Sequence, residues 1–216
     1  MFCESQVIDS ILMLETRLNK SILEISYKSG KSMQDISRQL NCSVHKVVYW
    51  MDKYDVKRRT RSEATYIKAN PSGDPFKIKI KLSPREKTLY GLGLGIYWGE
   101  GNKVTPHAVS VSNTDSKIIK VFIRFLEIIC NVRKDKIKYS LVCFNNSNLQ
   151  EVAGYWSEQL SVNFQEFGKI VQIPPQGKGT YKRKSRYGVC AVRVNNIKLK
   201  SWIMSEIDKT SNAWIV

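Results

Sequence analysis

The spacing of hydrophobic residues changes along this chain, and the first third has the period of amphipathic helices. Apolar side chains recur three and four residues apart up to Tyr54, with polar residues between them. Ser29-Gly30 and Asn41-Cys42-Ser43 interrupt the pattern, and Ser43 is a favourable N-cap for the segment that follows. We therefore expect four short helices, over residues 5–17, 19–29, 33–40 and 44–54.

The last two of these helices have a spacing that resembles a helix-turn-helix. Small Ser37 lies where the two helices would touch. Asn41 takes the turn position, where a positive φ is needed that asparagine tolerates better than most residues. Such a module inserts its second helix into the major groove of DNA, and here that helix would present Ser43, His45, Lys46 and Tyr49. The alternative is a small helical bundle without this role, because helix pairs joined by short turns are common.

A basic tail follows, in which Lys57, Arg58, Arg59 and Arg61 lie close together. These side chains would lie along phosphates or enter a minor groove, although such a run can also be an ordinary solvated segment. A short helix is expected over 62–68, and the stretch 70–75 (Asn-Pro-Ser-Gly-Asp-Pro) is the clearest linker in the chain. The predicted organisation is a helix-turn-helix domain over 1–69, a linker or extended arm over 70–83, and a second domain over 84–216.

The second domain mixes helical and alternating segments. Just before it, 76–82 alternates apolar residues with lysines, which fits a half-buried strand or an extended arm. The elements expected after it are a helix over 84–100, strands over 102–105 and 108–112, a helix over 116–130, a strand over 136–144, a helix over 149–160, strands over 169–173 and 189–194, and a helix over 197–208. The predicted fold class is α+β, with an all-α domain first.

The helix expected over 84–100 is unusual in its glycine content. It starts with a capping box formed by Ser83 and Glu86. Gly91, Gly95 and Gly99 then recur every fourth residue and share one face. Each interior glycine costs about 1 kcal/mol relative to alanine, so close packing of a second helix is the expected compensation. The interleaved apolar residues disfavour a loop, the run is too short for a membrane span, and no GxGxxG or Walker pattern is present.

Charge narrows the choice of partner. The 216 residues carry 35 Lys and Arg against 19 Asp and Glu, a net charge of +16, which favours nucleic acid. The charge is not gathered on one amphipathic helix, as a membrane-surface protein would require. The five cysteines never form a CxxC pair and there are only two histidines, so a zinc site is not expected. With no signal peptide or span recognisable, we expect an intracellular protein, cytoplasmic or nucleoid-associated, with no membrane contact.

The segment Gly93-Leu94-Gly95-Ile96-Tyr97-Trp98-Gly99-Glu100-Gly101 resembles the LAGLIDADG motif of homing endonucleases. The small residue, acid and glycine that close the motif fall on Gly99, Glu100 and Gly101. This sequence departs from the motif at Gly93, where leucine is usual, and at Trp98, where a first acid is usual; aspartate is commoner than glutamate at position 100. The resemblance implies that two such helices pack side by side.

The resemblance also implies a fold. From residue 84 the order of expected elements resembles the αββαββα plan of this family with one helix inserted. In that family a curved antiparallel sheet lies on DNA and its exposed face makes the contacts. Here those contacts would come from Lys136, Lys138 and Arg193, with Ser140 and Asn195, and from Lys182, Arg183, Lys184 and Arg186 in a basic loop. Each of these cations taken alone also fits an ordinary solvated surface.

A metal site is implied as well. In this family the final acid of each motif helix binds a divalent cation at the DNA backbone, so Glu100 and Gly99 would form a site for Mg²⁺ or Mn²⁺. Such a cation polarises the phosphate and activates water, and Mg²⁺ needs few carboxylates. Single-motif members dimerise through the motif helix. The resemblance therefore implies a homodimer on double-stranded DNA, with Gly91, Gly95 and Gly99 at the interface and no nucleotide cofactor.

Two further catalytic positions are implied by their place in the family plan. A polar residue near the end of the second strand positions water, which matches Asn113 or, less closely, Asp115; Asn113 also fits a helix N-cap. A basic residue near the last strand completes the set, which matches Lys198 or Arg193.

The leading hypothesis is a site-specific, metal-dependent DNA endonuclease with an N-terminal helix-turn-helix. The alternative is a non-cleaving DNA-binding transcriptional regulator built on a degenerate LAGLIDADG domain; the retained Glu100 favours the enzyme. An RNA-binding maturase fits the charge and fold, but no specific feature supports it.

Overall fold

The chain divides into two compact units, Met1–Asp74 and Pro75–Val216, called unit 1 and unit 2 below. The computed structural model describes residues 19–168, 170–174 and 185–215. The helix expected over 5–17 lies outside these residues. The division falls inside the stretch 70–83 interpreted as a linker, and each unit has its own hydrophobic core.

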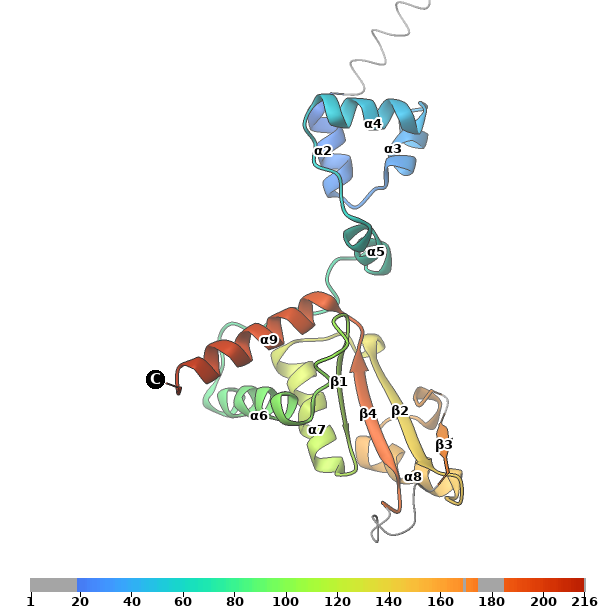
Figure 1. The fold of residues 1–216 in the computed structure, drawn as a ribbon, viewed down its shortest axis with the longest axis vertical. Helices are drawn as coiled ribbons and strands as arrows, with labels where there is room; N and C mark the ends of the chain where they lie inside the picture. The colour runs from blue at the N-terminus through green and yellow to red at the C-terminus, as the bar shows by residue number, and fades with distance from the viewer. Residues whose placement is uncertain (1–18, 169, 175–184, 216) are drawn as a thin grey trace, which may run out of the picture. The chain divides into compact units, whose positions relative to one another are not determined.

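Unit 1 is built from short helices that begin where the sequence offers a cap. α2 (Lys20–Lys28) is capped by Asn19, α3 (Met33–Gln39) by Ser32 and α4 (Val44–Lys53) by Ser43. Figure 1 shows these three helices packed around a small centre, which is made by Leu23, Tyr27, Ile36, Val47, Trp50 and Met51. Asn41 has φ 50°, the left-handed conformation that the turn between α3 and α4 was expected to need. A fourth helix, α5 (Arg61–Ala69), buries no residue.

Unit 2 is α+β, with a four-stranded mixed sheet in the order β1-β4-β2-β3. The strands are β1 (Val109–Asn113), β2 (Ile137–Phe144), β3 (Val171–Ile173) and β4 (Val189–Val194). β4 pairs antiparallel with both β1 and β2, whereas β2 and β3 are parallel. The expectation of an antiparallel sheet is therefore wrong at β3. A helix crosses between β2 and β3 and returns the chain to the same end of the sheet, which makes the two strands parallel.

The strand expected over 102–105 is absent from the described residues, and of the two alternatives for 76–82 the extended arm is the one present. Between 102 and 105 there is no strand; the chain meets β1 at the bridge from Gly101 to Val111 and through the bond from the Asn102 N–H to the Ser110 carbonyl. Residues 76–82 are extended but pair with no strand. Instead, the N–H groups of Lys77 and Lys79 donate to the carbonyls of Cys130 and Ile129, at 3.0 and 2.9 Å. The carbonyls at a helix end satisfy these donors, so the segment lies along unit 2 as an arm.

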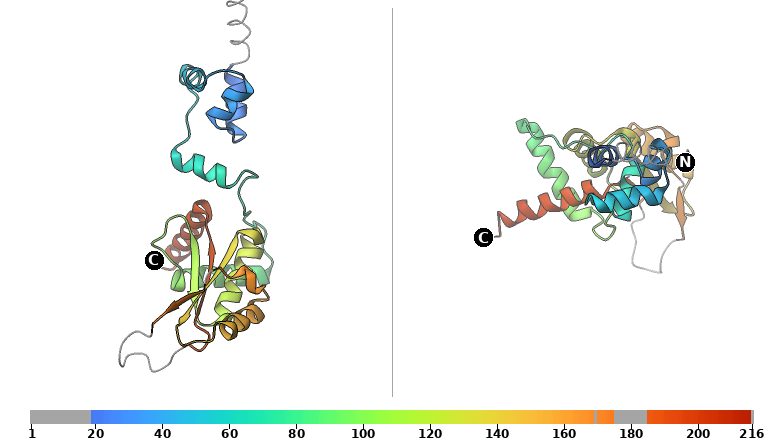
Figure 2. Two further views of the ribbon diagram at one scale, coloured as in Figure 1. Left: turned by 90° about the vertical axis from the view of Figure 1, so that its right-hand side faces the viewer. Right: turned by 90° about the horizontal axis from the view of Figure 1, so that it is seen from above.

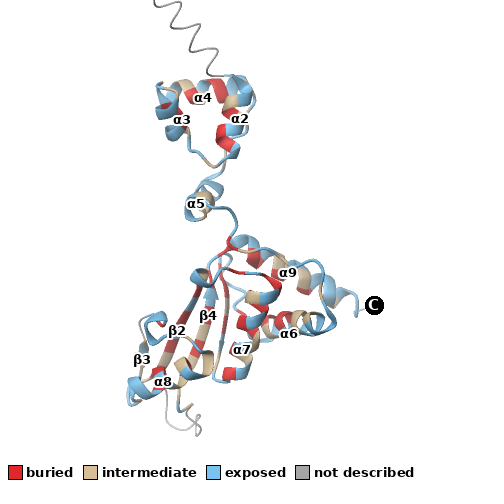
Figure 3. Cartoon of the chain, turned by 180° about the vertical axis from the view of Figure 1, so that it is seen from behind, coloured by how far each residue is buried: buried red, intermediate tan, exposed pale blue. Residues whose placement is uncertain are grey.

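Helices cover one face of the sheet and leave the other open. They are α6 (Pro84–Glu100), α7 (Ser116–Arg124), α8 (Leu149–Leu160) and α9 (Ile197–Asn212), with short 3-10 turns at η2 (Lys134–Lys136) and η3 (Phe164–Glu166). α6 and α9 lie at the β1 edge of the sheet, and both extend away from it (Figures 1 and 2). The buried residues gather on α7 and the adjoining parts of the strands (Figure 3). None of the described helices has the length and hydropathy to cross a membrane.

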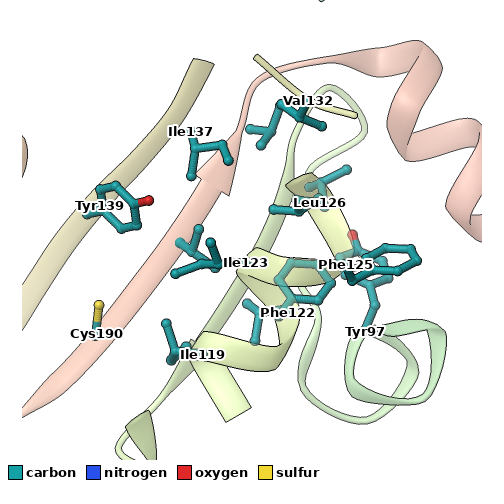
Figure 4. Close-up of a cluster of buried hydrophobic side chains, with 14 of the residues drawn as sticks. Tyr97, Ile119, Phe122, Ile123, Phe125, Leu126, Val132, Ile137, Tyr139 and Cys190 are labelled. Carbon is teal, nitrogen blue, oxygen red and sulfur yellow. The ribbon is translucent and has the colours of Figure 1, made fainter. Parts of the chain in front are cut away.

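The helix expected over 116–130 is present, but its last turn is wider than an α-helix. α7 continues into a π-helix, η1 (Phe125–Ile129), in which the Cys130 N–H donates to the Phe125 carbonyl at 3.1 Å. This turn directs the Phe125 ring against α6, in the cluster with Tyr97 and Phe122 seen in Figure 4. At the contact, a Cβ on Gly93 would lie 2.1 Å from Phe125 Cγ. Gly93 is therefore the glycine of α6 that the fold of unit 2 itself requires.

Gly93→Ala is expected to lower the free energy of unfolding by about 1–3 kcal/mol, the usual cost of overpacking a core. The matched control is Gly154→Ala in α8, where an added Cβ meets nothing within 4 Å. The control should be neutral or stabilising by up to about 1 kcal/mol, because alanine favours the helix. Urea denaturation measures both. A Gly93→Ala protein as stable as the wild type would contradict the contact.

The arm also makes an ion pair that predicts a pH dependence. Glu86 accepts a hydrogen bond from Lys79 Nζ at 2.6 Å and one from the Ser83 N–H at 2.9 Å. The Lys79 bond, then the Ser83 bond, lower the pKa of Glu86 from its usual 4.5 to about 2. As the pH falls, Glu86 therefore becomes protonated in the unfolded chain before it does in the folded chain. The stability that Glu86 contributes is present above about pH 4.5 and is lost as the pH falls toward 2.

Glu86→Gln should accordingly make the stability of unit 2 less dependent on pH between 4.5 and 2, as measured by thermal unfolding across that window. Glu158→Gln in α8 is the control, because the Glu158 side chain has no ion-pair partner among the described residues. An unchanged pH profile for Glu86→Gln would rule out this contribution.

Candidate nucleic-acid interface

The C-terminal end of α6 carries Glu100 at the edge of the sheet. Glu100 is the last residue of the helix and is exposed. The next residue, Gly101, leaves the helix in an extended conformation, with φ −75° and ψ 145°. Its N–H donates to the Tyr97 carbonyl at 2.9 Å, and the Asn102 N–H donates to the Ser110 carbonyl of β1 at 2.9 Å. These bonds fix the backbone on which the carboxylate stands.

Gly101 is needed for a close approach, although not for a left-handed C-cap. A Cβ at this position would lie 2.3 Å from the Tyr97 carbonyl oxygen and 2.6 Å from its ring. A larger residue would push the chain away from α6 and from the bridge to Val111. The closing glycine of the motif therefore brings the residue after Glu100 down onto the helix.

A buried lysine lies beneath this turn, and the sequence reasoning did not find it. Lys200, in the first turn of α9, is only 5% exposed. Its Nζ donates to the hydroxyl of Tyr97 and to the carbonyl of Asn102, and the Tyr97 hydroxyl donates to the same carbonyl at 2.7 Å. Burial lowers the pKa of Lys200, and the charge of Lys103 lowers it further. The available signal was periodic, because position 200 shares the buried stripe of Ile203 and Ile207.

The two other expected catalytic positions lie on other elements than Glu100, at the end of β1 and in the first turn of α9. Asn113 ends β1, and its side chain accepts the Asp115 N–H at 2.9 Å, while Asp115 in turn caps α7. These side chains thus organise the turn into α7. The bridge to β1 is at Val111, so about 7 Å of strand separates it from Asn113. Lys198 is exposed in the first turn of α9.

The open face of the sheet carries two cations side by side. The register aligns Ser110, Arg193 and Lys138 in one row, and Ser112, Ala191 and Ser140 in the next. Arg193 and Lys138 are exposed, and Arg193 Nε donates to Asn195 Oδ1 at 2.6 Å. Lys136 lies in the turn η2, before β2 begins, and is half-buried. A small-residue surface with adjacent cations is open enough to admit a phosphate backbone.

In unit 1, α4 presents the side chains expected of a recognition helix. Ser43 is its N-cap and accepts the Lys46 N–H at 3.2 Å. His45 is exposed, Lys46 is half-buried, and Tyr49 is 60% exposed. The opposite side of α4 supplies Val47, Trp50 and Met51 to the core. The polar and aromatic face is therefore available for contact.

Part of the basic tail is used inside unit 1. The Arg59 guanidinium lies 3.9 Å from the Tyr27 ring centroid and donates to the Lys31 carbonyl at 3.2 Å. The backbone N–H of Arg59 donates to the Tyr27 hydroxyl. Arg58 pairs with Asp52 at 3.5 Å. The Arg59 contacts fasten the tail to α2 and the segment after it, and the Arg58 pair fastens it to α4, so the Arg59 guanidinium is engaged within unit 1. Lys57 and Arg61 remain exposed.

The basic loop is described only at its end. Lys182, Arg183 and Lys184 lie outside the described residues. Arg186 pairs with Glu151 of α8 at 2.6 Å, and Tyr187 stacks on Tyr155 with ring centroids 3.8 Å apart. The inserted helix α8 therefore anchors the chain as it enters β4.

The glycine face of α6 borders an apolar groove. Gly91, Gly95 and Gly99 are exposed, and a Cβ at any of them would meet nothing within 4 Å. Trp98, on the same side, is 58% exposed. The groove has a volume of about 470 Å³ and runs between α6 and the C-terminal end of α9, lined by Gly91, Leu94, Gly95, Trp98, Ile207, Trp214 and Ile215 among others. Among the described residues, no helix packs against this face.

Within the described residues, no three His, Cys, Asp or Glu side chains form a group that could hold a metal ion. Comparisons with protein-family models, with curated proteins and with solved structures find no match to this chain.

Proposed function

We propose that the protein is a divalent-metal-dependent, site-specific endonuclease of the LAGLIDADG type, which hydrolyses phosphodiester bonds in double-stranded DNA as a homodimer. The observation that carries this proposal is the end of α6, where an exposed carboxylate, Glu100, stands at the sheet edge beside an uncovered glycine face. The net charge of +16 supports a polyanionic substrate.

The fold of unit 2 supports the proposal in part. α6, α7 and α9, with β1, β2 and β4, follow the order of the αββαββα plan, and the helices leave one sheet face open. The departures are the first hairpin, which is reduced to the bridge from Gly101 to Val111, and the parallel strand β3. Neither departure changes the pairing of β4 with β1 and β2, which brings Arg193 and Lys138 together on the open face.

A homodimer would complete the site. In a twofold interface the same patch meets itself, and bare glycines at every fourth residue allow two α6 helices to approach closely. The exposed Trp98 and the apolar groove beside it would be covered by the same contact. Each chain contributes one Glu100, and two such helices bring two carboxylates together. Without a cation those charges would repel each other, which favours metal binding between them.

The donor set fits Mg²⁺ or Mn²⁺. Glu100 and the backbone carbonyl of Gly99 would hold the cation, since hard cations take carboxylate and carbonyl oxygens and keep several waters or phosphate oxygens. A bound cation supplies Lewis-acid polarisation of the phosphate and activation of water. Glu100 would hold the cation at the exposed end of α6. Lys198 and Asn113 remain the proposed basic and water-positioning residues.

DNA would be bound by both units. Lys138 and Arg193 on the open sheet face would contact phosphates near the site of cleavage. His45, Lys46 and Tyr49 of α4 would enter a major groove, with Lys57 and Arg61 on flanking phosphates. Because both modules belong to one chain, binding of one raises the effective concentration of the other.

Cleavage of a randomised DNA library in Mg²⁺ tests the reaction. We expect cuts by the wild type, and binding without cuts by Glu100→Gln, because the amide removes the charge that holds the cation. Glu158→Gln, which changes an exposed acid of α8, should cut normally. Specific binding without cleavage by the wild type would instead favour the DNA-binding regulator. Cuts that survive Glu100→Gln would reject the assigned site.

Gly95→Leu tests the dimer by sedimentation velocity. A leucine side chain in the middle of the glycine face should separate the paired helices and yield a monomer, while the fold of unit 2 is retained because that face is open in the chain itself. Gly154→Leu adds the same bulk at an uncrowded position of α8 and should leave the dimer unchanged. A Gly95→Leu dimer of wild-type affinity would contradict the proposed interface.

A further inference from the structure

Lys200 is a buried cation that neutral oxygens bind. Its ammonium contacts the Tyr97 hydroxyl and the Asn102 carbonyl and lies 4.8 Å from the Tyr97 ring centroid. Within the described residues it makes no ion pair with a carboxylate. Burying an ammonium without an acid costs free energy. An apolar residue would fill the same space without this penalty, so stability alone does not explain a lysine here.

The two partners of Lys200 stand on either side of Glu100 in the sequence. Tyr97 is three residues before it, in the last turn of α6, and Asn102 is two residues after it, where the chain meets β1. An ammonium has three donors, and here one ammonium joins the helix to the segment that leaves it. The Tyr97 hydroxyl closes the triangle through its own bond to the Asn102 carbonyl, at 2.7 Å.

This triangle limits how the turn can move. If Tyr97 and Asn102 keep a fixed separation, the intervening backbone of Gly99, Glu100 and Gly101 has little freedom to rotate. The Gly101 bridge to Val111 and the bond from the Asn102 N–H to the Ser110 carbonyl tie the other side to the sheet. Lys200 is therefore the contact through which α9 holds the carboxylate-bearing turn.

We propose that Lys200 is a positioning residue for Glu100: it clamps the end of α6 so that the Glu100 carboxylate and the Gly99 carbonyl face the cation in a fixed geometry. The role in metal binding rests on the function proposed above, whereas the clamp itself does not. Lys200 acts through Tyr97 and Asn102 and does not touch substrate.

Two variants separate the clamp from simple packing. Lys200→Met keeps the length and apolar stem of the side chain but removes the donors, and the Tyr97 hydroxyl can still satisfy the Asn102 carbonyl. Tyr97→Phe removes the hydroxyl and keeps the ring stacked on Phe122, at 5.9 Å between centroids. Lys117→Met is the control, because Lys117 is an exposed lysine at the start of α7.

The first measurement is amide hydrogen exchange at Gly101 and Asn102, whose N–H groups bond to Tyr97 and Ser110. We expect faster exchange at both amides in Lys200→Met and in Tyr97→Phe, with no change in Lys117→Met. The double variant should be no faster than the faster single variant, since both groups belong to one network. Unchanged exchange in both single variants would overturn the clamp.

The second measurement is the Mg²⁺ concentration that gives half-maximal DNA cleavage. Loss of an indirect support for a metal ligand typically weakens metal affinity by about 10-fold to 100-fold, and we expect Lys200→Met to raise this concentration within that range. A wild-type Mg²⁺ dependence in a variant with faster exchange would overturn the positioning role. If the wild type makes no cuts, the proposed function fails, while faster exchange would still support the clamp.

Discussion

The contact between Gly93 and the Phe125 ring decides how α6 lies on unit 2. Because there is no side chain at position 93, the helix backbone rests on the aromatic cluster of Phe122 and Phe125. The rotation of α6 about its axis is then fixed, with Gly93, Leu94 and Tyr97 inward. A helix turns 100° per residue, so Gly91, Gly95 and Trp98 must point away from the core. The uncovered glycine face follows from this single contact, whereas Glu100 lies on the same side of α6 as Gly93 and is exposed because it is the last residue of the helix.

The other end of α6 is held by different chemistry. Packing fixes the middle of the helix, but the turn after Glu100 is fixed by polar contacts: the Tyr97 hydroxyl, the Asn102 carbonyl and the buried ammonium of Lys200. The arm acts at the first turn, where Lys79 meets Glu86. A helix restrained in these three ways is a rigid support, as the proposed site for a cation and a phosphate would require.

The cations show why charge patterns in a sequence do not specify contacts. Lys57, Arg58, Arg59 and Arg61 form one basic run, yet Arg59 stacks on Tyr27 and fastens the tail to α2. Arg186 belongs to an equally basic loop and is paired with Glu151. Lys138 and Arg193 lie far apart in the sequence and become neighbours only because β2 and β4 pair. The net charge supports a polyanionic partner, but tertiary contacts select which cations can meet it.

What the sequence alone determined was local. The bounds of α4, α8 and β4, the caps at Ser43 and Ser83, and the left-handed Asn41 depend on periodicity and on hydrogen bonds within a few residues, so they could be predicted. The tertiary structure decided the parallel pairing of β3, the choice of an arm over a strand at 76–82, the inward role of Gly93 and the burial of Lys200. Each of these depends on which distant segment lies opposite; for Lys200 the period of α9 places the side chain on the buried face, but the sequence does not name the groups that it meets there. The acid at position 100 was therefore visible in the sequence, whereas the lysine that holds its turn became visible only when α9 was seen against α6.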